Sequence, residues 1–357
     1  DFLPRYNKAM VPLAKMFKIL RTRQYFLELF NHPERLAFLQ AVEHAPFVAP
    51  PALPSPVMEQ ANSGGRALSI EDLGIEVVGS DRRRVSRKER FVQGPFVKLG
   101  RHARSLLVGS AMPDIYSSVY AISTMAQCHS LTGVPRNGPL SDIKRQQDLI
   151  KQVWNALSES EVLVGRPAQD RKLLLATWRR NVMGVLEADP DKALRRAQAL
   201  YDAGVRTFRL YSPEPGKNVL RALQKLRSHL GSQVEIFVGQ VVDLGQAQKL
   251  EEAGADGLYV GIGGGGRCIT GVRSGSVIDW PMLLWQLRGN ISIPVIVEGG
   301  ASDHVATTLA LGASGIGVSR IAGGGTIESP GGMLYCIDHE GRYFKPYGVR
   351  PRPAPSS

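Results

Sequence analysis

A cysteine within a run of glycines is the part of this sequence best suited to chemistry. Residues 261–270 read Gly-Ile-Gly-Gly-Gly-Gly-Arg-Cys-Ile-Thr, so Cys268 lies just after the glycines and two positions before Thr270. Glycines let the backbone turn sharply and approach a ligand closely. Arg267 or nearby amides would lower the pKa of the thiol from its ordinary value of about 8.5, which favours the nucleophilic thiolate. The pattern indicates a cysteine presented to a small molecule, and a small buried structural cysteine is the alternative.

Three further loops combine glycines with polar side chains. They are Gly109-Ser110-Ala111-Met112, Glu298-Gly299-Gly300, and the stretch from Gly317 through Ser319 to the glycine-rich residues 323–332, which include Glu328. A carboxylate such as Glu298 can accept hydrogen bonds from ribose hydroxyls, and amides at the start of a helix bind phosphate. Each glycine pair alone is explained by a tight turn between a strand and a helix. Together on one rim, these loops favour a nucleotide monophosphate.

Short apolar strands alternate with amphipathic helices along the part of the chain that carries these loops. We expect strands at residues 105–108, 131–134, 181–186, 207–210, 235–238, 258–260, 295–297 and 315–319. Helices are expected at 116–126, 141–157, 190–203, 218–230, 244–253, 279–287 and 304–311, with a glycine-rich helix start after the last strand. Such alternation over about 250 residues predicts an α/β fold of the closed (β/α)8 TIM barrel type, with all the loops named above on its carboxyl rim. A doubly wound open sheet is the alternative.

The composition is that of a globular protein with a core. Of 357 residues, 43% are hydrophobic and 21% are charged, and no apolar run reaches the roughly 18 residues of a membrane span. Three widely spaced cysteines argue against a disulfide scaffold and fit a reducing, cytoplasmic location.

The formal net charge of +12 comes largely from clusters of basic residues at 82–84, 87–88, 101–104, 179–180 and 195–196. These clusters lack the interleaved aromatic side chains of a platform for single-stranded nucleic acid. We therefore interpret them chiefly as solvated faces, with attraction of anionic ligands as a secondary effect, and expect no nucleic-acid partner.

We divide the chain into a helical N-terminal extension with a proline-rich linker (1–65), a barrel domain (66–350) and a tail (351–357). Within the extension, residues 10–30 have helical spacing and a second helix is expected over 33–42, with Asn31 as its cap. The first helix is expected to pack on the barrel or on another subunit. A basic amphipathic segment for targeting or for a membrane surface is the alternative.

The cysteine loop resembles that of the IMP dehydrogenase and GMP reductase family, whose pattern is Gly-x-Gly-x-x-Cys-x-Thr. Residues 263–270 fit this pattern position for position. The Ser-Ala-Met turn at 110–112 and the Lys-Pro-Tyr-Gly segment at 345–348 are similar to other segments of the family. The resemblance covers about residues 67–348 and implies the same barrel. We expect a diverged member without CBS domains or the full catalytic flap.

The resemblance implies roles for individual residues. Cys268 would attack C2 of a purine nucleotide, and a hydride would pass between that carbon and NAD or NADP. Thr270 would assist proton transfer, and Glu328 would pair with it in a reductase-type reaction. The implied substrate-binding residues are Ser110, Met112, Glu298, Gly299, Gly300, Gly317, Ser319, Tyr347 and Gly348. Gly261 and Gly263 would contact the cofactor, and carbonyls of Gly263, Gly265 and Cys268 would hold a monovalent cation such as K⁺. A homotetramer is also implied.

Several positions depart from the family pattern. The Asp that binds the nicotinamide ribose at the end of the fourth strand is missing from Leu210-Tyr211-Ser212, and the Asn after the fifth strand is Gln240. The ribose-binding Asp after the seventh strand is Glu298, and Arg136 stands in the changed segment after the second.

The missing flap favours a GMP-reductase-like or altered reaction over IMP dehydrogenation. The sequence thus predicts an oxidoreductase acting on a purine 5′-monophosphate (IMP, GMP or XMP). The alternatives are a catalytically inactive nucleotide-binding barrel with a regulatory or partner role, and a flavin-dependent barrel enzyme.

Overall fold

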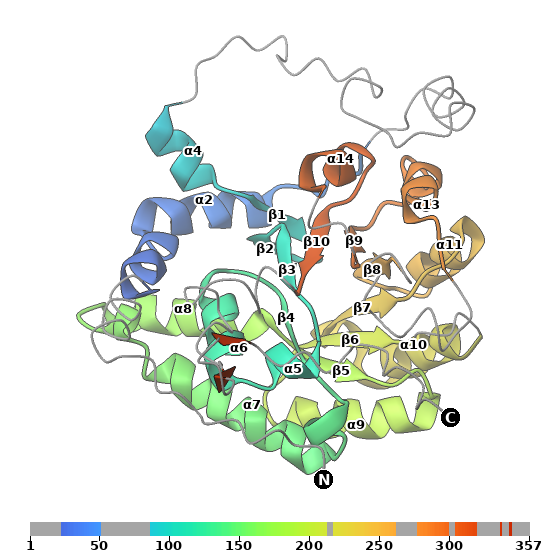
Figure 1. Ribbon diagram of the computed structural model, residues 1–357, viewed down its shortest axis with the longest axis horizontal. Helices are drawn as coiled ribbons and strands as arrows, with labels where there is room; N and C mark the ends of the chain where they lie inside the picture. Colours follow the sequence, from blue (N-terminus) through green and yellow to red (C-terminus); the bar gives the residue numbers. More distant parts are fainter. Residues whose placement is uncertain are drawn as a thin grey trace.

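Eight parallel strands form the centre of the molecule (Figure 1). The structure is a computed structural model that describes residues 23–50, 86–212, 217–261, 277–299, 304–319, 336–337 and 343–344. The strands are β3 (Leu107–Gly109), β4 (Thr132–Val134), β5 (Val182–Leu186), β6 (Thr207–Tyr211), β7 (Glu235–Gly239), β8 (Gly257–Val260), β9 (Val295–Val297) and β10 (Gly315–Val318). Their order in the sheet is β3-β10-β9-β8-β7-β6-β5-β4.

The two ends of this sheet meet. The amide of Gly109 donates to the carbonyl of Leu131 at 2.6 Å, and the amide of Ser105 donates to the carbonyl of His129 at 2.7 Å. These bonds join the segment of β3 to the segment that leads into β4, so the sheet closes on itself. The prediction of a (β/α)8 barrel is confirmed, and the open doubly wound sheet was the wrong alternative.

Helices surround the strands (Figure 1). They are α5 (Pro113–Tyr116), α6 (Val119–Gln127), α7 (Ile143–Ser158), α8 (Ala168–Arg180), α9 (Pro190–Asp202), α10 (Lys217–Leu230), α11 (Leu244–Glu252), α13 (Trp280–Leu287) and α14 (Val305–Ala310), with short 3-10 turns η1 (Gly138–Leu140), η2 (Glu161–Leu163) and η3 (Gly231–Gln233). An aspartate side chain caps α7, α9, α11 and α13 by accepting a backbone N–H of the first turn. Helix α8 was not expected from the sequence. No helix in the described ranges is long and apolar enough to cross a bilayer.

The inside of the barrel is filled with side chains. Val108, Leu131, Met183, Phe237, Tyr259 and Ile296 form one buried cluster together with Leu99. A second, larger cluster lies between the strands and the surrounding helices. Residues alternate between these two environments along each strand, as the pleat requires. In β6, Phe208 and Leu210 face the helices, so Thr207, Arg209 and Tyr211 face inward.

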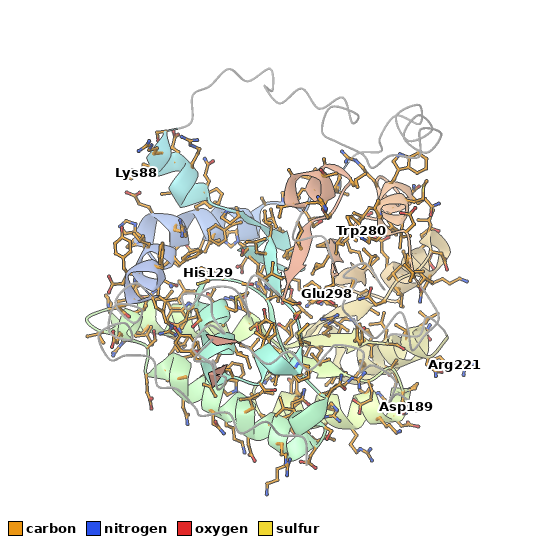
Figure 2. All side chains as sticks on the ribbon, in the orientation of Figure 1. Lys88, His129, Asp189, Arg221, Trp280 and Glu298 are labelled. Carbon is orange, nitrogen blue, oxygen red and sulfur yellow. The ribbon has the colours of Figure 1, made fainter. Side chains whose placement is uncertain are left out.

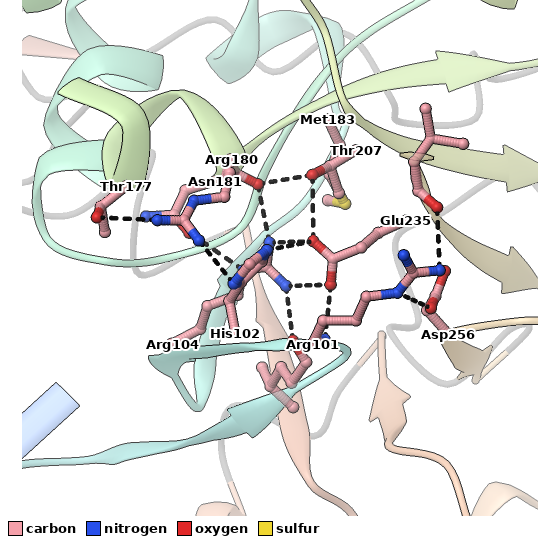
Figure 3. Close-up of polar contacts among 12 residues, drawn as sticks. Arg101, His102, Arg104, Thr177, Arg180, Asn181, Met183, Thr207, Glu235 and Asp256 are labelled. Carbon is pink, nitrogen blue, oxygen red and sulfur yellow. Dashed lines mark hydrogen bonds and ion pairs between the residues drawn. The ribbon is translucent and has the colours of Figure 1, made fainter. Parts of the chain in front are cut away.

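A hairpin closes the N-terminal end of the barrel. It consists of β1 (Phe96–Leu99) and β2 (His102–Ser105), which pair antiparallel. Arg104 on β2 is fully buried, and its guanidinium donates to both carboxylate oxygens of Glu235 at 2.9 and 2.6 Å (Figure 3). Burial alone would raise the pKa of Glu235, but the charge and hydrogen bonds of Arg104 outweigh it and the pKa is lowered.

The interpretation of the basic clusters as chiefly solvated faces does not hold for two arginines. Arg104 is buried against Glu235, and Arg196 is 6% exposed with its guanidinium on Glu187. Each acidic partner lies on a different element from its arginine. Local charge density could not show these pairings.

Part of the N-terminal extension packs on the barrel itself. Residues 23–30 are helical, and they are followed by α2 (Pro33–His44); after residues 51–85, which lie outside the described part of the chain, comes α4 (Arg87–Gln93). Leu27 is 1% exposed and belongs to the main core, and the Arg35 guanidinium lies over the rings of Phe30 and Phe96. The boundary at residue 65 stays a prediction.

Asn31 was expected to cap α2, but it does not. His32 is the cap, and its side chain accepts the amide of Glu34. The buried Asn31 side chain instead donates to the carbonyls of Leu27 and Gln127 and accepts the indole N–H of Trp178 at 3.0 Å. It therefore ties the extension to α6 and α8.

Near the C-terminus, β11 (Cys336–Ile337) pairs antiparallel with β12 (Tyr343–Phe344).

Candidate active site at the carboxyl rim

The described candidate residues lie where barrel strands end. Ser110 and Met112 follow β3, Gly261 follows β8, Glu298 and Gly299 follow β9, and Gly317 and Ser319 lie at the end of β10. Strands β3, β10, β9 and β8 are consecutive neighbours in the barrel, so these residues share one sector of the carboxyl rim. Figure 2 shows Glu298 near the middle of the ring of strands.

Glu298 is held by an arginine from across the barrel. Its Oε1 accepts from Nη1 of Arg209 at 2.8 Å, and its Oε2 accepts from Nη2 of the same guanidinium. The Arg209 side chain is 3% exposed and that of Glu298 is 16% exposed. Burial alone would lower the pKa of Arg209, but the Glu298 carboxylate outweighs it and the pKa is raised. The result is a bidentate, buried ion pair at the mouth of the barrel.

Two tyrosine rings flank this guanidinium. The Arg209 Cζ lies 4.1 Å from the ring centre of Tyr259 and 4.8 Å from that of Tyr211. Tyr259 is fully buried in the barrel interior, whereas Tyr211 is half-buried at the end of β6. Arg209 Nε has no hydrogen-bond partner within the described structure. Both terminal nitrogens of the guanidinium, Nη1 and Nη2, therefore donate to Glu298.

Two glycines make room for Glu298. A Cβ on Gly261, which has φ +123°, would lie 1.8 Å from the Glu298 carbonyl oxygen. A Cβ on Gly317 would lie 2.5 Å from Cγ of Glu298. Larger residues at either position would displace the glutamate. These contacts account for both glycines without a bound ligand, and the expected cofactor contact of Gly261 stays a prediction.

The first and eighth barrel strands are joined by serine hydroxyls. Ser319 Oγ donates to Ser110 Oγ at 3.1 Å, and Ser110 Oγ accepts the amide of Met112 at 3.3 Å. Below them, the Tyr116 hydroxyl donates to the carbonyl of Val318 at 3.0 Å. The structure therefore brings Ser110, Met112 and Ser319 together, and their role in a ligand site stays a prediction.

The opposite sector of the rim is basic and aromatic. Arg136, after β4, donates to the Tyr211 carbonyl at 3.3 Å, and burial lowers the pKa of this arginine. Glu187, after β5, accepts two hydrogen bonds from Arg196 at 2.7 and 3.2 Å. The side-chain carbonyl of Gln240, after β7, is buried without a hydrogen-bond partner in the described part of the chain. In its described part, this sector therefore offers cations and an amide, and the Glu187 carboxylate is already paired with Arg196.

Arg209 was missed from the sequence. The alternation of residues 207–211 could have revealed it, because Arg209 falls on the face of the strand that points into the barrel. A charged side chain buried there needs a partner of opposite charge. Glu298, at the end of another strand, is such a partner.

Eight candidate residues lie outside the described part of the chain: Gly263, Gly265, Cys268, Thr270, Gly300, Glu328, Tyr347 and Gly348. Their roles remain predictions. The strand that leads to the cysteine loop, β8, is described up to Gly261.

Comparison with known proteins decides the family. A sequence model of the IMP dehydrogenase / GMP reductase domain matches residues 100–349, well over half of the chain. The chain belongs to the IMP dehydrogenase / GMP reductase family. The match begins within the N-terminal hairpin and includes every barrel strand.

Similar members of this family are inosine-5′-monophosphate dehydrogenases. That of Helicobacter pylori is 36% identical over 163 residues, which cover 43% of this chain and 32% of the relative. That of Cryptosporidium parvum is 32% identical over 161 residues (43% and 40%), and that of Rhodopirellula baltica is 27% identical over 241 residues (58% and 44%). The matched region thus spans less than half the length of each of these relatives.

Proposed function

We propose that this chain is an oxidoreductase of purine nucleotide metabolism that acts at C2 of a purine 5′-monophosphate. The observation that carries the proposal is the fixed carboxylate of Glu298 at the carboxyl rim, beside the ends of β8 and β10, in a barrel of this family. Ligands of (β/α)8 enzymes bind at this rim, and their phosphates commonly sit at the loops after the seventh and eighth strands.

In the proposed complex, Glu298 accepts hydrogen bonds from the ribose hydroxyls. Backbone amides of Gly299, Gly300 and Gly317 donate to the phosphate oxygens. The Ser319 hydroxyl, which donates to Ser110 in the structure, rotates to donate to the phosphate as well. Ser110 and Met112 lie beside the base. Tyr347 and Gly348 close over the nucleotide.

Cys268 is the proposed nucleophile. Its sulfur adds to C2 of the purine. Thr270 assists proton transfer when water displaces the sulfur from C2 in the dehydrogenase direction, or when the 2-amino group leaves C2 as ammonia in the reductase direction. Glu328 pairs with Thr270 in the reductase-type reaction. A nicotinamide coenzyme, NAD or NADP, would supply the hydride acceptor or donor. Carbonyls of Gly263, Gly265 and Cys268 would hold K⁺. A homotetramer is the proposed assembly.

The described end of β6 does not match the usual nicotinamide site. A carboxylate that accepts from the ribose diol is expected there, but the end of the strand presents Tyr211, with Arg136 on its carbonyl and Arg209 beneath its ring. We therefore assign no coenzyme contact to these residues. This mismatch favours a second candidate, a barrel that binds the nucleotide without redox chemistry and serves a regulatory role.

Turnover separates the two candidates. Purified protein is incubated with IMP and NAD⁺ or NADP⁺, or with GMP and NADPH, while the absorbance of the reduced nicotinamide is followed. The proposal predicts turnover that Cys268→Ser abolishes while purine nucleotide binding is kept. Nucleotide binding without turnover in the unaltered protein would support the second candidate. A protein purified with yellow flavin would contradict both.

A further inference from the structure

The Glu298 side chain is the longer of the two acidic types and has three rotatable bonds, so in isolation it would point in many directions. In the described part of this barrel, the Glu298 carboxylate is bound by Arg209. Both oxygens accept from one planar guanidinium, and the backbone amide of Glu298 donates a hydrogen bond to the carbonyl of Val260 at 2.9 Å. A fork that binds both oxygens sets the plane of the carboxylate as well as its position.

The arginine is itself held in place. Its side chain crosses the barrel from β6, three strands away from β9, and its guanidinium lies between Tyr259 and Tyr211. Cation–π contacts with two rings restrict the positions that a guanidinium can take. Among the described residues, Arg209 Nε has no hydrogen-bond partner, and Glu298 is the carboxylate that the guanidinium binds.

A carboxylate bound in this way can still recognise hydroxyls. Each carboxylate oxygen has two lone-pair directions, and the guanidinium uses one on each oxygen. The remaining two lie on the outer sides of the oxygens and diverge from each other, so one of them can accept from a sugar hydroxyl while the guanidinium stays bound. The positive charge of Arg209 also cancels the charge of Glu298, so the carboxylate repels the nearby phosphate of a nucleotide less.

We propose that Arg209 is a positioning residue and specificity determinant: it holds a Glu298 oxygen in place as an acceptor for the ribose 2′-hydroxyl, so that the site selects ribonucleotides over 2′-deoxyribonucleotides. This inference rests on the proposed function, because it takes the ligand to be a purine monophosphate. Arg209 acts through Glu298 and makes no contact with the sugar itself.

The test compares the dissociation constants of IMP and 2′-deoxy-IMP by calorimetric titration. Loss of one hydrogen bond to a charged acceptor corresponds to a preference of the unaltered protein of about 10-fold or more for IMP. Arg209→Met removes the fork at similar side-chain length, and the preference should fall to about 2-fold or less once Glu298 is free to rotate. Arg209→Lys keeps the charge without the fork, and should give an intermediate ratio.

A double variant isolates the route of the effect. We expect Glu298→Ala alone to lose the preference for IMP over 2′-deoxy-IMP. Adding Arg209→Met to this variant should leave the ratio of the two dissociation constants unchanged. The matched control is Glu235→Gln, which breaks the other buried Arg–carboxylate pair, at the opposite end of the barrel. It should lower stability while the preference for IMP stays that of the unaltered protein.

Three results would overturn the inference. A folded Arg209→Met or Arg209→Lys variant that keeps the full preference would show that Glu298 needs no fork. A loss of preference in Glu235→Gln equal to that in Arg209→Met would show a general effect of weakened packing. An unaltered protein that binds no purine monophosphate would overturn both this inference and the proposed function, which distinguishes it from the first two results.

Discussion

At the carboxyl rim, two side chains of opposite charge meet in a site that water barely reaches. The Arg209–Glu298 pair is bidentate and largely buried. Two charges removed from water in this way are stable only together, because either one alone would be buried without compensation. The pair therefore links the fold of the barrel to the proposed ligand site.

Glu298→Ala should affect both binding and stability. We expect purine monophosphate affinity to fall about 10- to 100-fold, since hydrogen bonds to a charged acceptor are lost. The free energy of unfolding should fall by about 3–5 kcal/mol, because Arg209 is left as a buried unpaired cation. Urea unfolding and nucleotide titration measure the two effects. Glu159→Ala, at an exposed glutamate after α7, is the control and should change neither. Unchanged nucleotide affinity in Glu298→Ala would remove this residue from the site.

The cysteines should differ in reactivity. Burial raises the pKa of the Cys128 thiol to about 12, so it stays protonated and unreactive at neutral pH. Cys268, as the proposed nucleophile, should be alkylated by iodoacetamide about 100-fold faster than Cys128, and purine monophosphate should protect it. Peptide mapping by mass spectrometry after timed labelling measures both rates. Equal slow labelling of the two thiols, or labelling of Cys268 that nucleotide does not slow, would argue against the nucleophilic role.

Most elements could be predicted from the sequence. All eight barrel strands lie within a few residues of their expected positions, because apolar runs and aspartate caps are local signals. The β1–β2 hairpin, α4 and α8 were missed. The hairpin carries His102 and Arg104, and its burial depends on Glu235, more than 130 residues away in the sequence. A contact between residues so far apart in the sequence cannot be predicted from the pattern of neighbouring residues.

The same limit applies to single polar residues of the extension. Asn31 looked like a helix cap because it precedes a proline-initiated helix. Its real partners, Gln127 and Trp178, lie on other helices. In the candidate site, Glu298 and Ser319 were predictable from their place after strands, whereas Arg209 required the register of β6 and its partner together.

Asn31→Ala tests the attachment of the extension. The indole N–H of Trp178 would lose its acceptor in a buried site, and we expect the free energy of unfolding to fall by about 1–3 kcal/mol. Urea unfolding followed by tryptophan fluorescence measures the change. Asn155→Ala, at an exposed position of α7, should have an effect of less than about 0.5 kcal/mol. Equal effects of the two substitutions would mean that the contact of Asn31 with the barrel contributes nothing specific.

His129 should make stability depend on pH at the turn between α6 and β4. Burial, aided by the nearby Arg35 charge, lowers the pKa of this histidine to about 4. The unfolded chain binds a proton near pH 6.5 and the folded chain does not until about pH 4, so stability falls as the pH drops through this window.

His129→Asn should remove this part of the pH dependence, which has a slope of at most about 1.4 kcal/mol per pH unit. Asparagine tolerates the positive φ of 58° at this position. Urea unfolding at pH 7, 6, 5 and 4 gives the slopes. Glu43→Gln is the comparison: the pKa of Glu43 is lowered to about 2 by its hydrogen bond with His102, so this carboxylate affects stability below about pH 4.5. Equal slopes between pH 6.5 and 4.5 in the unaltered protein and in His129→Asn would contradict the assignment.

Over the whole molecule, the barrel has a buried Arg–carboxylate pair near each end. Arg104–Glu235 lies under the N-terminal hairpin, and Arg209–Glu298 lies at the carboxyl rim. The first pair is covered by β1 and β2 and serves the fold. The second is beside the rim loops, where enzymes of this architecture bind their ligands. The proposed purine site belongs to the end that carries the second pair.

The most direct test of that site is unfolding in the presence of separate ligands. Melting temperatures are compared for IMP, GMP, XMP, FMN, NADH and NADPH. The account predicts that at least one purine monophosphate stabilises the folded chain, by about 2.7 kcal/mol at 100 times its dissociation constant, and that FMN does not. Stabilisation by FMN alone, or by none of the purine monophosphates, would contradict a purine nucleotide site at the mouth of this barrel.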